Sequence, residues 1–354
     1  MASRLRLEIS QSAIARNMDV IRHRAGQCRI LAVIKANAYG LGALKMGAYL
    51  KTQGVSCFGA ATLDEALELL PLGMPVQILG ALLPEETAPA VKAGLRCPVD
   101  SFATAERISR EAVRQGKTAD CDIAVDTGMG RLGILADGSA AEEIRRIAAL
   151  PNLALNGLFS HFSSAGEADG AYSKLQLERF LKLYKELNMP FTRVHHAASE
   201  GILMVDRAME PPFTQVRAGL GMYANALTLK ARIGAVRHMP AGSFLSYSRT
   251  CKLAKDTVVG VVCAGYADGI PQILSNKGEM IVKGKRCAIL GRVCMDYTLL
   301  DLSGVPDVQT GDEVVCFAPG ENAVTPEQWG VWKGTHLHDI LCAISPRVER
   351  AWLP

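Results

Sequence analysis

Short apolar runs alternate with amphipathic stretches from residue 10 to about residue 220. Eight of these runs are apolar enough to predict buried strands. They are Ile30–Ile34, Cys57–Ala61, Val76–Leu79, Arg96–Val99, Cys121–Val125, Leu155–Phe159, Arg193–His196 and Thr214–Arg217. The stretches between them space apolar residues as a helix does, and several begin at Ser or Thr and end at Gly or Pro. The clearest predicted helices are Thr62–Leu70, Glu85–Ala93, Ser101–Gln115, Ser139–Ala149 and Tyr172–Leu187.

Eight successive strand–helix units indicate an α/β fold. A (β/α)₈ TIM barrel is built from eight such units and carries its functional loops at the C-terminal ends of the strands. A doubly wound parallel sheet is the alternative, because the order of strands cannot be read from this pattern. We therefore predict an N-terminal (β/α)₈ barrel.

The pattern changes after about residue 240. Short β-type runs separated by glycine turns predict strands. The runs are Leu245–Leu253, Thr257–Ala264, Glu279–Val282, Arg286–Leu290, Tyr297–Leu302 and Asp312–Phe317, and a helical pattern returns only at Thr325–Cys342. We expect residues 1–238 to form the barrel and residues 239–354 to form a mostly β C-terminal domain, which agrees with about two domains for 354 residues.

Composition and charge exclude several classes of protein. Hydrophobic residues make up 49% and charged residues 21% of the chain, which excludes disorder as its main state. The net charge of +4 is too small and dispersed to predict a nucleic-acid partner. No apolar stretch has the length of a membrane span, and the first ten residues lack the core of a signal peptide. The ten cysteines form no Cys-x-x-Cys pair, so we expect reduced thiols, a cytoplasmic location and no metal.

Two polar segments follow predicted barrel strands. Lys35 comes directly after an apolar strand and precedes a turn that contains Tyr39. Burial lowers the pKa of a lysine and makes its amine a nucleophile toward carbonyl groups. Arg131 lies in the glycine-rich segment after Val125, and its planar guanidinium suits a carboxylate or a phenolate oxygen.

Further candidates follow the last three predicted barrel strands. His161 follows the sixth strand, Ser199 follows the seventh, and Arg217 ends the eighth. Barrels often bind phosphate with the loops after the last two strands, where a hydroxyl and backbone N–H groups are available. The N–H groups in question are those of Gly219 and Leu220, and candidates in the C-terminal domain are Tyr247, Met295 and Asp296.

Four motifs together resemble those of alanine racemase, the fold-type III family that uses pyridoxal 5′-phosphate (PLP). They are Val33–Gly42 (VIKANAYGLG), Asp126–Gly133 (DTGMGRLG), Gly265–Gly269 (GYADG) and Val293–Asp296 (VCMD). The resemblance covers residues 30 to 350 in order and spacing. It implies a PLP-binding barrel followed by a β domain, a homodimer, and interconversion of L- and D-alanine. For a bacterial member it also implies D-alanine supply for peptidoglycan.

The resemblance implies two opposed bases. Lys35 binds PLP covalently and serves as one base, while Tyr247, reaching in from the other subunit of a dimer, serves as the other. Arg217 faces the pyridine nitrogen, and His161 packs between Arg217 and Tyr247. Because removal of the α-proton from one face and its return to the other needs two acid–base groups, this assignment suits a racemase.

The remaining candidates hold the cofactor and the substrate. By resemblance, Arg131 contacts the phenolic oxygen of PLP and the substrate carboxylate. Met295 lies at that carboxylate through its backbone, with Asp296 beside it. The phosphate is held by Tyr39, Ser199, Gly219 and Leu220.

Three positions depart from the family's common pattern. Ala124 stands where many members carry a carboxylated lysine that orients the arginine, so we expect another carboxylate or an anion such as chloride to orient Arg131. Ala198 replaces a frequent asparagine, and Pro346 replaces a tyrosine found near the pocket in some members. A racemase of broader specificity, which accepts serine or larger amino acids, is therefore an alternative.

Other PLP proteins of this fold type fit less well. A non-catalytic PLP-binding protein lacks the β domain and therefore lacks a counterpart of Tyr247. Metal-assisted lyases need a His-x-Cys pair, which does not occur here. A basic amino acid decarboxylase needs a catalytic cysteine, for which Cys294 is a weak candidate.

Overall fold

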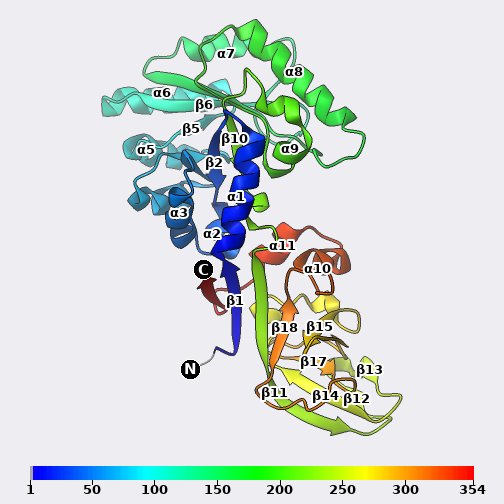
Figure 1. The fold of residues 1–354 in the computed structure, drawn as a ribbon. Coiled ribbons are helices and arrows are strands. Elements are labelled where there is room, and N and C mark those ends of the chain that lie inside the picture. Colours follow the sequence, from blue (N-terminus) through cyan, green and yellow to red (C-terminus); the bar gives the residue numbers. More distant parts are fainter. Residues whose placement is uncertain (1–2) are drawn as a thin grey trace. The chain divides into compact units, whose positions relative to one another are not determined.

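A computed structural model describes residues 3–354 and divides the chain into two compact units. The barrel unit comprises residues 16–38 and 42–222. The β-rich unit comprises residues 3–15, 39–41 and 223–354. Figure 1 shows the elements of both units, coloured along the chain.

Eight parallel strands form the core of the barrel unit. They run in the orders β10–β2–β3–β4 and β5–β6–β8–β9. Backbone hydrogen bonds join the two runs, from Ile78 N to Arg96 O (3.0 Å) at β4 and β5 and from Thr214 N to Val194 O (3.0 Å) at β9 and β10. The sheet therefore closes on itself, which confirms the predicted barrel. The strands are β2 (Arg29–Val33), β3 (Cys57–Ala60), β4 (Val76–Ile78), β5 (Cys97–Val99), β6 (Ala119–Asp126), β8 (Leu153–Phe159), β9 (Arg193–His195) and β10 (Gln215–Ala218), and the short β7 (Ile134–Leu135) pairs with β6.

Helices follow the strands and surround the barrel (Figure 1). Helix α6 illustrates why they form: Ser101 Oγ caps it by accepting the N–H of Thr104 (3.2 Å), and Gly116 ends it in the left-handed region. Its buried residues repeat every three or four positions, as an amphipathic helix requires. The helices are α1 (Gln11–Ala25), α3 (Ala43–Thr52), α4 (Leu63–Leu69), α5 (Pro84–Ala93), α6 (Phe102–Gln115), α7 (Ala140–Ala148), α8 (Ala171–Leu187) and α9 (Ser199–Met204).

The β-rich unit is organised around the long strand β11 (Leu227–Met239). β11 pairs antiparallel with β1, β14 and β18, and β1 also pairs in parallel with β19. The N-terminal and C-terminal strands are thus neighbours in one sheet. The other elements are β1 (Leu5–Ser10), β14 (Thr257–Val262), β15 (Glu279–Val282), β16 (Lys285–Ala288), β17 (Thr298–Asp301), β18 (Glu313–Phe317), β19 (Glu349–Leu353), α10 (Pro326–Lys333) and α11 (Leu337–Cys342).

Three local predictions differ from the structure. The predicted strand Leu245–Leu253 is broken into β12 (Phe244–Leu245), a 3₁₀ turn and β13 (Cys251–Lys252), because Ser246 and Ser248 have positive φ angles of 60° and 59°. The predicted helical stretch Thr325–Cys342 is two helices, separated by the left-handed Gly334. Residues 223–238 belong to the β-rich unit, and the boundary expected at 238 and 239 falls at the end of β11.

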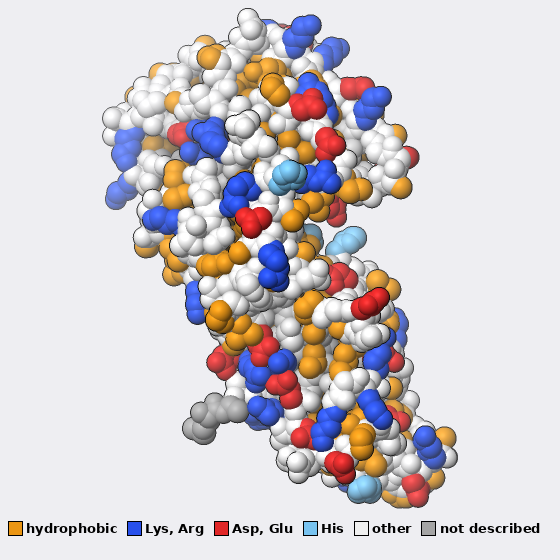
Figure 2. Space-filling model, viewed as in Figure 1, with side chains coloured by type: hydrophobic (Ala, Val, Ile, Leu, Met, Phe, Trp, Pro, Cys, Tyr) orange, Lys and Arg blue, Asp and Glu red, His pale blue; other side chains and the backbone are white. Residues whose placement is uncertain are grey.

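The visible surface carries charges of both signs. Figure 2 shows Lys, Arg, Asp and Glu side chains intermixed over this face, with apolar side chains scattered among them. Within residues 3–354, no helix combines the length and the apolar character that a membrane crossing needs.

Candidate active site

Lys35 begins a short left-handed helix directly after β2. This helix, α2, spans Lys35–Gly40. The φ angles of Ala36, Asn37, Ala38 and Tyr39 lie between 51° and 57°. This conformation costs about 1–2 kcal/mol for each L-residue, and such strain tends to occur at functional sites. The segment therefore needs support from its surroundings.

Glu65 supplies part of that support. Its carboxylate accepts the N–H of Ala36 at Oε1 (2.8 Å) and the N–H of Ala61 at Oε2 (2.8 Å). Asn37 adds a second anchor, because its Oδ1 accepts the N–H of Ala43 (2.7 Å). The sequence analysis missed Glu65, since an acidic residue in the first turn of α4 is ordinary and gives no sign of a contact with another loop.

Arg131 lies on a tightly held segment after β6. Asp126 Oδ1 accepts the N–H groups of Gly128 (2.8 Å) and Met129 (2.9 Å). Tyr172 donates its hydroxyl hydrogen to the carbonyl of Gly128 (2.7 Å). The Arg131 side chain is exposed, so the identity of the group that orients it stays a prediction.

The Arg217 guanidinium is buried at the end of β10 among neutral acceptors. Nη1 donates to His195 Nδ1 (2.6 Å), and Nη2 donates to His161 Nδ1 (2.9 Å). Nη2 also donates to the carbonyl oxygens of Ser160 (2.6 Å) and His196 (2.9 Å). Because a guanidinium can only donate, both histidines must present an unprotonated Nδ1 to it.

Positive charge gathers around His161. Burial, followed by the charges of Arg217, Arg131 and Lys35, lowers the pKa of His161 to about 3. Burial and the charge of Arg131 lower the pKa of Arg217 to about 9, which leaves its guanidinium charged at pH 7. The structure thus brings together four of the predicted site residues, and their combined charge favours an anionic ligand.

Ser199 and the segment after β10 form a small cradle. Ser199 Oγ accepts the N–H groups of Gly219 (3.0 Å) and Gly221 (3.0 Å). Leu220 begins the 3₁₀ turn η3 (Leu220–Tyr223). A Cβ on Gly221 would lie 3.1 Å from Ser199 Cβ, so a glycine keeps this approach open. Because Ser199 Oγ accepts both N–H groups, its own hydrogen is left to donate, which suits a phosphate oxygen. The contact with Gly221 is one that the sequence analysis missed.

Tyr39 lies on α2 and belongs to the β-rich unit. Its ring is buried and lies edge-on to Tyr223, with ring centroids 5.7 Å apart. The His338 ring packs on it at the same centroid distance of 5.7 Å. Burial raises the pKa of the Tyr39 hydroxyl, so it stays a neutral hydrogen-bond donor.

Tyr247 occupies the turn between β12 and β13. Its side chain is 68% exposed. The turn itself is fixed, because Ser246 Oγ donates to the carbonyl oxygen of Arg292 (2.5 Å). Ser246, Ser248 and Arg249 have φ angles of 60°, 59° and 55°. A well-anchored turn therefore presents Tyr247 to the solvent in a defined position.

Met295 and Asp296 lie in the same unit. The Met295 side chain is exposed, and its carbonyl oxygen accepts the N–H of Ala267 (3.0 Å). Asp296 Oδ1 accepts from Arg347 Nη2 (2.7 Å), and Arg347 Nε pairs with Asp268 (2.7 Å). Asp296 therefore has a protein partner that the sequence did not reveal. The predicted residues thus fall into two groups, one in each unit.

The positions that depart from the family pattern carry no polar side chain. Ala124 is buried in β6, Ala198 forms an isolated parallel bridge with Arg217, and Pro346 is exposed. All ten cysteines are free thiols. In the part of the chain that the structure describes, no group of three or more His, Cys, Asp or Glu side chains is arranged to hold a metal ion.

Known proteins show the same two-part organisation. The alanine racemase N-terminal domain family matches residues 9–226, and the alanine racemase C-terminal domain family matches residues 226–352. An alanine racemase of Desulforamulus reducens is 35% identical over 370 residues, covering 98% of both chains. An alanine racemase structure from Clostridium difficile 630 is 28% identical with a TM-score of 0.93, covering 100% of this chain and 96% of that chain. An alanine racemase from Bartonella henselae, solved with covalently bound pyridoxal phosphate, is 25% identical with a TM-score of 0.91, covering 99% of this chain and 100% of that chain. The chain therefore belongs to the alanine racemase family, and the protein is an isomerase.

Proposed function

We propose that the protein interconverts L- and D-alanine with PLP, using Lys35 and Tyr247 as the two groups that move the α-proton. The observation that carries this proposal is the clustering of Lys35, Arg131 and Arg217 around His161 at the C-terminal ends of the barrel strands. Positive charge at this edge of the barrel suits a cofactor and a substrate that both carry negative groups.

The residues present fit PLP. Ser199 Oγ accepts from Gly219 and Gly221, so its own hydrogen is left to donate to the phosphate of PLP. To this hydroxyl we add the segment Gly219–Leu220 and the neutral hydroxyl of Tyr39 as phosphate-binding groups. Lys35 supplies the amine for its covalent attachment. Arg217, which only donates hydrogen bonds, suits an unprotonated pyridine nitrogen. When bound, PLP supplies the electron sink that makes the α-proton acidic.

The chain's own side chains then perform the proton transfers. Lys35 Nζ takes or returns the α-proton on one face, and Tyr247 Oη does so on the other. Free lysine and tyrosine side chains ionise near pH 10, so a lysine or tyrosine base needs positive charge nearby to act near pH 7. Arg217 and Arg131 supply that charge. Arg131 also holds the substrate carboxylate, helped by the Met295 backbone and with Asp296 beside it.

We further propose a homodimer in which Tyr247 of one copy serves the barrel of the other. The support is the contrast between the firmly anchored turn and the exposed side chain of Tyr247. The ten free thiols support a reducing compartment, the cytoplasm. D-Alanine made there is the proposed precursor for peptidoglycan.

Exchange of the α-proton in D₂O tests the proposed reaction. Proton NMR of a pool of L-amino acids with protein and PLP is expected to show loss of the alanine α-signal. Additional loss of the serine signal would indicate a pocket opened by Pro346. Lys35→Ala should abolish the exchange, whereas Lys45→Ala, at an exposed position on α3, should preserve it. A pool in which no α-signal fades would contradict the proposal.

A further inference from the structure

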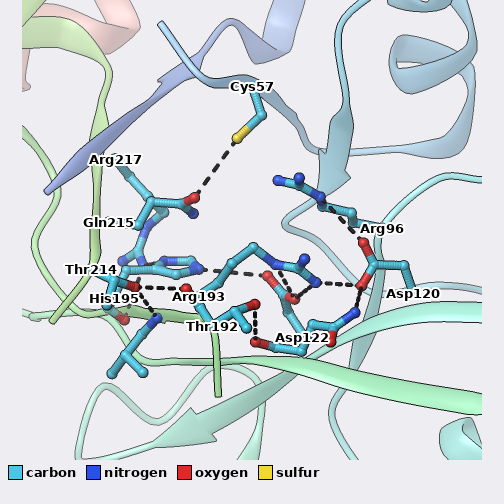
Figure 3. Close-up of polar contacts among 12 residues, drawn as sticks. Cys57, Arg96, Asp120, Asp122, Thr192, Arg193, His195, Thr214, Gln215 and Arg217 are labelled. Carbon is cyan, nitrogen blue, oxygen red and sulfur yellow. Dashed lines mark hydrogen bonds and ion pairs between the residues drawn. The ribbon is translucent and has the colours of Figure 1, made fainter. Parts of the chain in front are cut away.

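A buried carboxylate lies behind the proposed cofactor site. Asp122 on β6 is 0% exposed and faces the barrel interior beside His195 (Figure 3). Arg193 donates to its Oδ1 from Nε (2.9 Å) and from Nη2. Because Oδ1 takes both of these hydrogen bonds, Oδ2 is left for another donor.

The fold reserves space for this carboxylate. A Cβ placed on Gly157 of β8 would lie 2.1 Å from Oδ1 of Asp122, which no side chain tolerates. Arg193 also pairs with Asp120 (2.5 Å), and Asp120 pairs with Arg96 (3.4 Å). Asp122 is therefore held in one position by steric fit and by an outer layer of ion pairs.

His195 connects Asp122 to Arg217. His195 Nδ1 accepts from Arg217 Nη1 at 2.6 Å, so Nδ1 carries no hydrogen. In a neutral imidazole the hydrogen is then on Nε2, which lies 3.7 Å from Asp122 Oδ2. In residues 3–354, neither Nε2 nor Oδ2 has a hydrogen-bond partner within normal distance. Because unpaired buried polar atoms cost free energy, a small movement that brings His195 Nε2 and Asp122 Oδ2 within hydrogen-bond distance is favoured.

The surroundings keep His195 neutral. Burial lowers the pKa of His195 to about 4, with Asp122 opposing this shift and the charges of Arg217 and Arg193 adding to it. The Phe159 ring stacks on the imidazole, with centroids 5.1 Å apart and planes 5° apart. Burial alone would raise the pKa of Asp122, but the nearby imidazole of His195 and the hydrogen-bonded guanidinium of Arg193 bring it below its ordinary value.

We propose that Asp122 is a positioning residue for the racemase reaction: it fixes His195 in the Nε2–H tautomer, so that His195 accepts from Arg217 and holds the guanidinium in place. The carboxylate never touches the reacting atoms and acts only through the imidazole, as buried partners of metal-bound histidines do. The role of Asp122 in the reaction rests on the proposed function, which places Arg217 at the cofactor. The Nε2–H tautomer of His195 is independent of that function, because it follows from contacts within the barrel.

The isosteric variant Asp122→Asn tests the tautomer. Its Oδ1 can still accept from Arg193, which leaves the amide N–H group facing His195 Nε2. The amide N–H and an Nε2–H of His195 would then both be donors, so the imidazole proton moves to Nδ1. A proton on Nδ1 faces the N–H of Arg217, and the hydrogen bond between Arg217 and His195 is lost. Asp120→Asn is the matched control, because Asp120 lies on the same strand and pairs with Arg193 but does not contact His195.

Nitrogen-15 NMR of the full chain, with and without PLP, reports the tautomer directly. One of the seven histidines is assigned to residue 195 by its loss in His195→Gln. We expect the Nε2–H form in the wild type and in Asp120→Asn, and its loss in Asp122→Asn, with or without PLP. We also expect kcat/KM of Asp122→Asn to fall about 10- to 100-fold relative to Asp120→Asn.

Several results would overturn the proposal. A wild-type His195 with its proton on Nδ1 would do so even if Asp122→Asn failed to fold. Retention of the Nε2–H form in Asp122→Asn would show that Asp122 does not position His195. Equal kcat/KM values for Asp122→Asn and Asp120→Asn would show the same. A protein that showed the Nε2–H form without racemising alanine would contradict the proposed function and leave the tautomer assignment intact.

Discussion

The two units hold their functional groups in opposite ways. In the barrel unit, Arg217 and His195 are almost fully buried, and the geometry is determined by hydrogen bonds that Arg217 donates to His195 Nδ1 and to nearby carbonyl oxygens. In the β-rich unit, the Tyr247 backbone is held firmly, but its side chain is 68% exposed. The barrel thus surrounds the Arg217 guanidinium with its own acceptors, whereas the β-rich unit presents the Tyr247 side chain to the solvent.

If the proposed mechanism holds, this difference reflects how the two bases are divided between subunits. Groups that bind and orient a charged cofactor gain from burial, because electrostatic interactions strengthen when water is excluded. A group that comes from another molecule must stay exposed until that molecule docks. Four predictions test this contrast between buried and exposed groups, in order of decreasing expected effect.

Removal of the Tyr247 hydroxyl should have the largest effect. Tyr247→Phe is expected to lower kcat/KM by about 10²- to 10⁴-fold, because it deletes a general acid–base group. Stability should change by less than about 0.5 kcal/mol, because the side chain is exposed. Racemisation rates and urea unfolding check both parts. Tyr297→Phe, also exposed and in the same unit, should retain wild-type rates, and equal losses in the two variants would contradict the assignment.

Acid should destabilise the barrel unit through its buried histidines. His195 and His196 are 0% exposed, and burial lowers the pKa of His195 to about 4 and that of His196 well below 6.5. Below pH 6.5 the unfolded chain therefore binds more protons, so the free energy of unfolding falls as pH falls toward 4. The slope approaches about 1.4 kcal/mol per pH unit for each histidine.

Urea unfolding between pH 7 and pH 4.5 measures that slope. His196→Gln should reduce the slope of unfolding free energy against pH by the contribution of one histidine. His238→Gln, at an exposed position of β11, should leave it unchanged. A slope unaffected by either substitution would mean that the buried histidines do not govern the acid response.

Loss of the Glu65 charge should weaken the left-handed helix. Glu65→Gln leaves one amide N–H group facing the backbone N–H of Ala36 or of Ala61, and we expect a loss of about 1–3 kcal/mol in unfolding free energy. PLP affinity should fall as well, because Lys35 begins this helix. Glu68→Gln, exposed on the same helix, is the control, and equal behaviour of the two variants would remove the anchoring role.

Relief of backbone strain should have the smallest effect. Ala36 is exposed with a φ of 51°, so Ala36→Gly should leave unfolding free energy unchanged or raise it by up to about 1 kcal/mol. Ala103→Gly in the right-handed helix α6 should lower it by about 0.5–1 kcal/mol. Chemical denaturation distinguishes the two. A comparable loss at Ala36 would show that α2 is not strained.

The sequence predicted the barrel well because each strand carries its own signal. Runs such as Cys57–Ala61 and Leu155–Phe159 became β3 and β8 with small changes at their ends. The strands β1 and β19 were missed because they pair across the whole length of the chain. Leu5–Ser10 does alternate apolar and polar residues, as a half-buried strand does, but this local pattern does not show which strands it pairs with.

The candidate site divides in the same way. Lys35, Arg131, His161 and Arg217 stand next to strand ends, and the barrel pattern alone brings them to one edge. Glu65 and Asp122 were missed, because each acts through a contact that depends on three-dimensional placement. For Asp122 there was one signal, a charged residue inside the apolar run Cys121–Val125.

Complementation between two inactive variants tests the central claim, that one copy's barrel works with the other copy's Tyr247. Lys35→Ala and Tyr247→Phe are each mixed with themselves or with each other, and the subunits are allowed to exchange. In a mixed dimer, one site retains both Lys35 and Tyr247. We predict recovery of about a quarter of wild-type alanine racemisation in the mixture and none in either variant alone. If mixed dimers form and no activity returns, the two groups do not meet across subunits and the account is wrong.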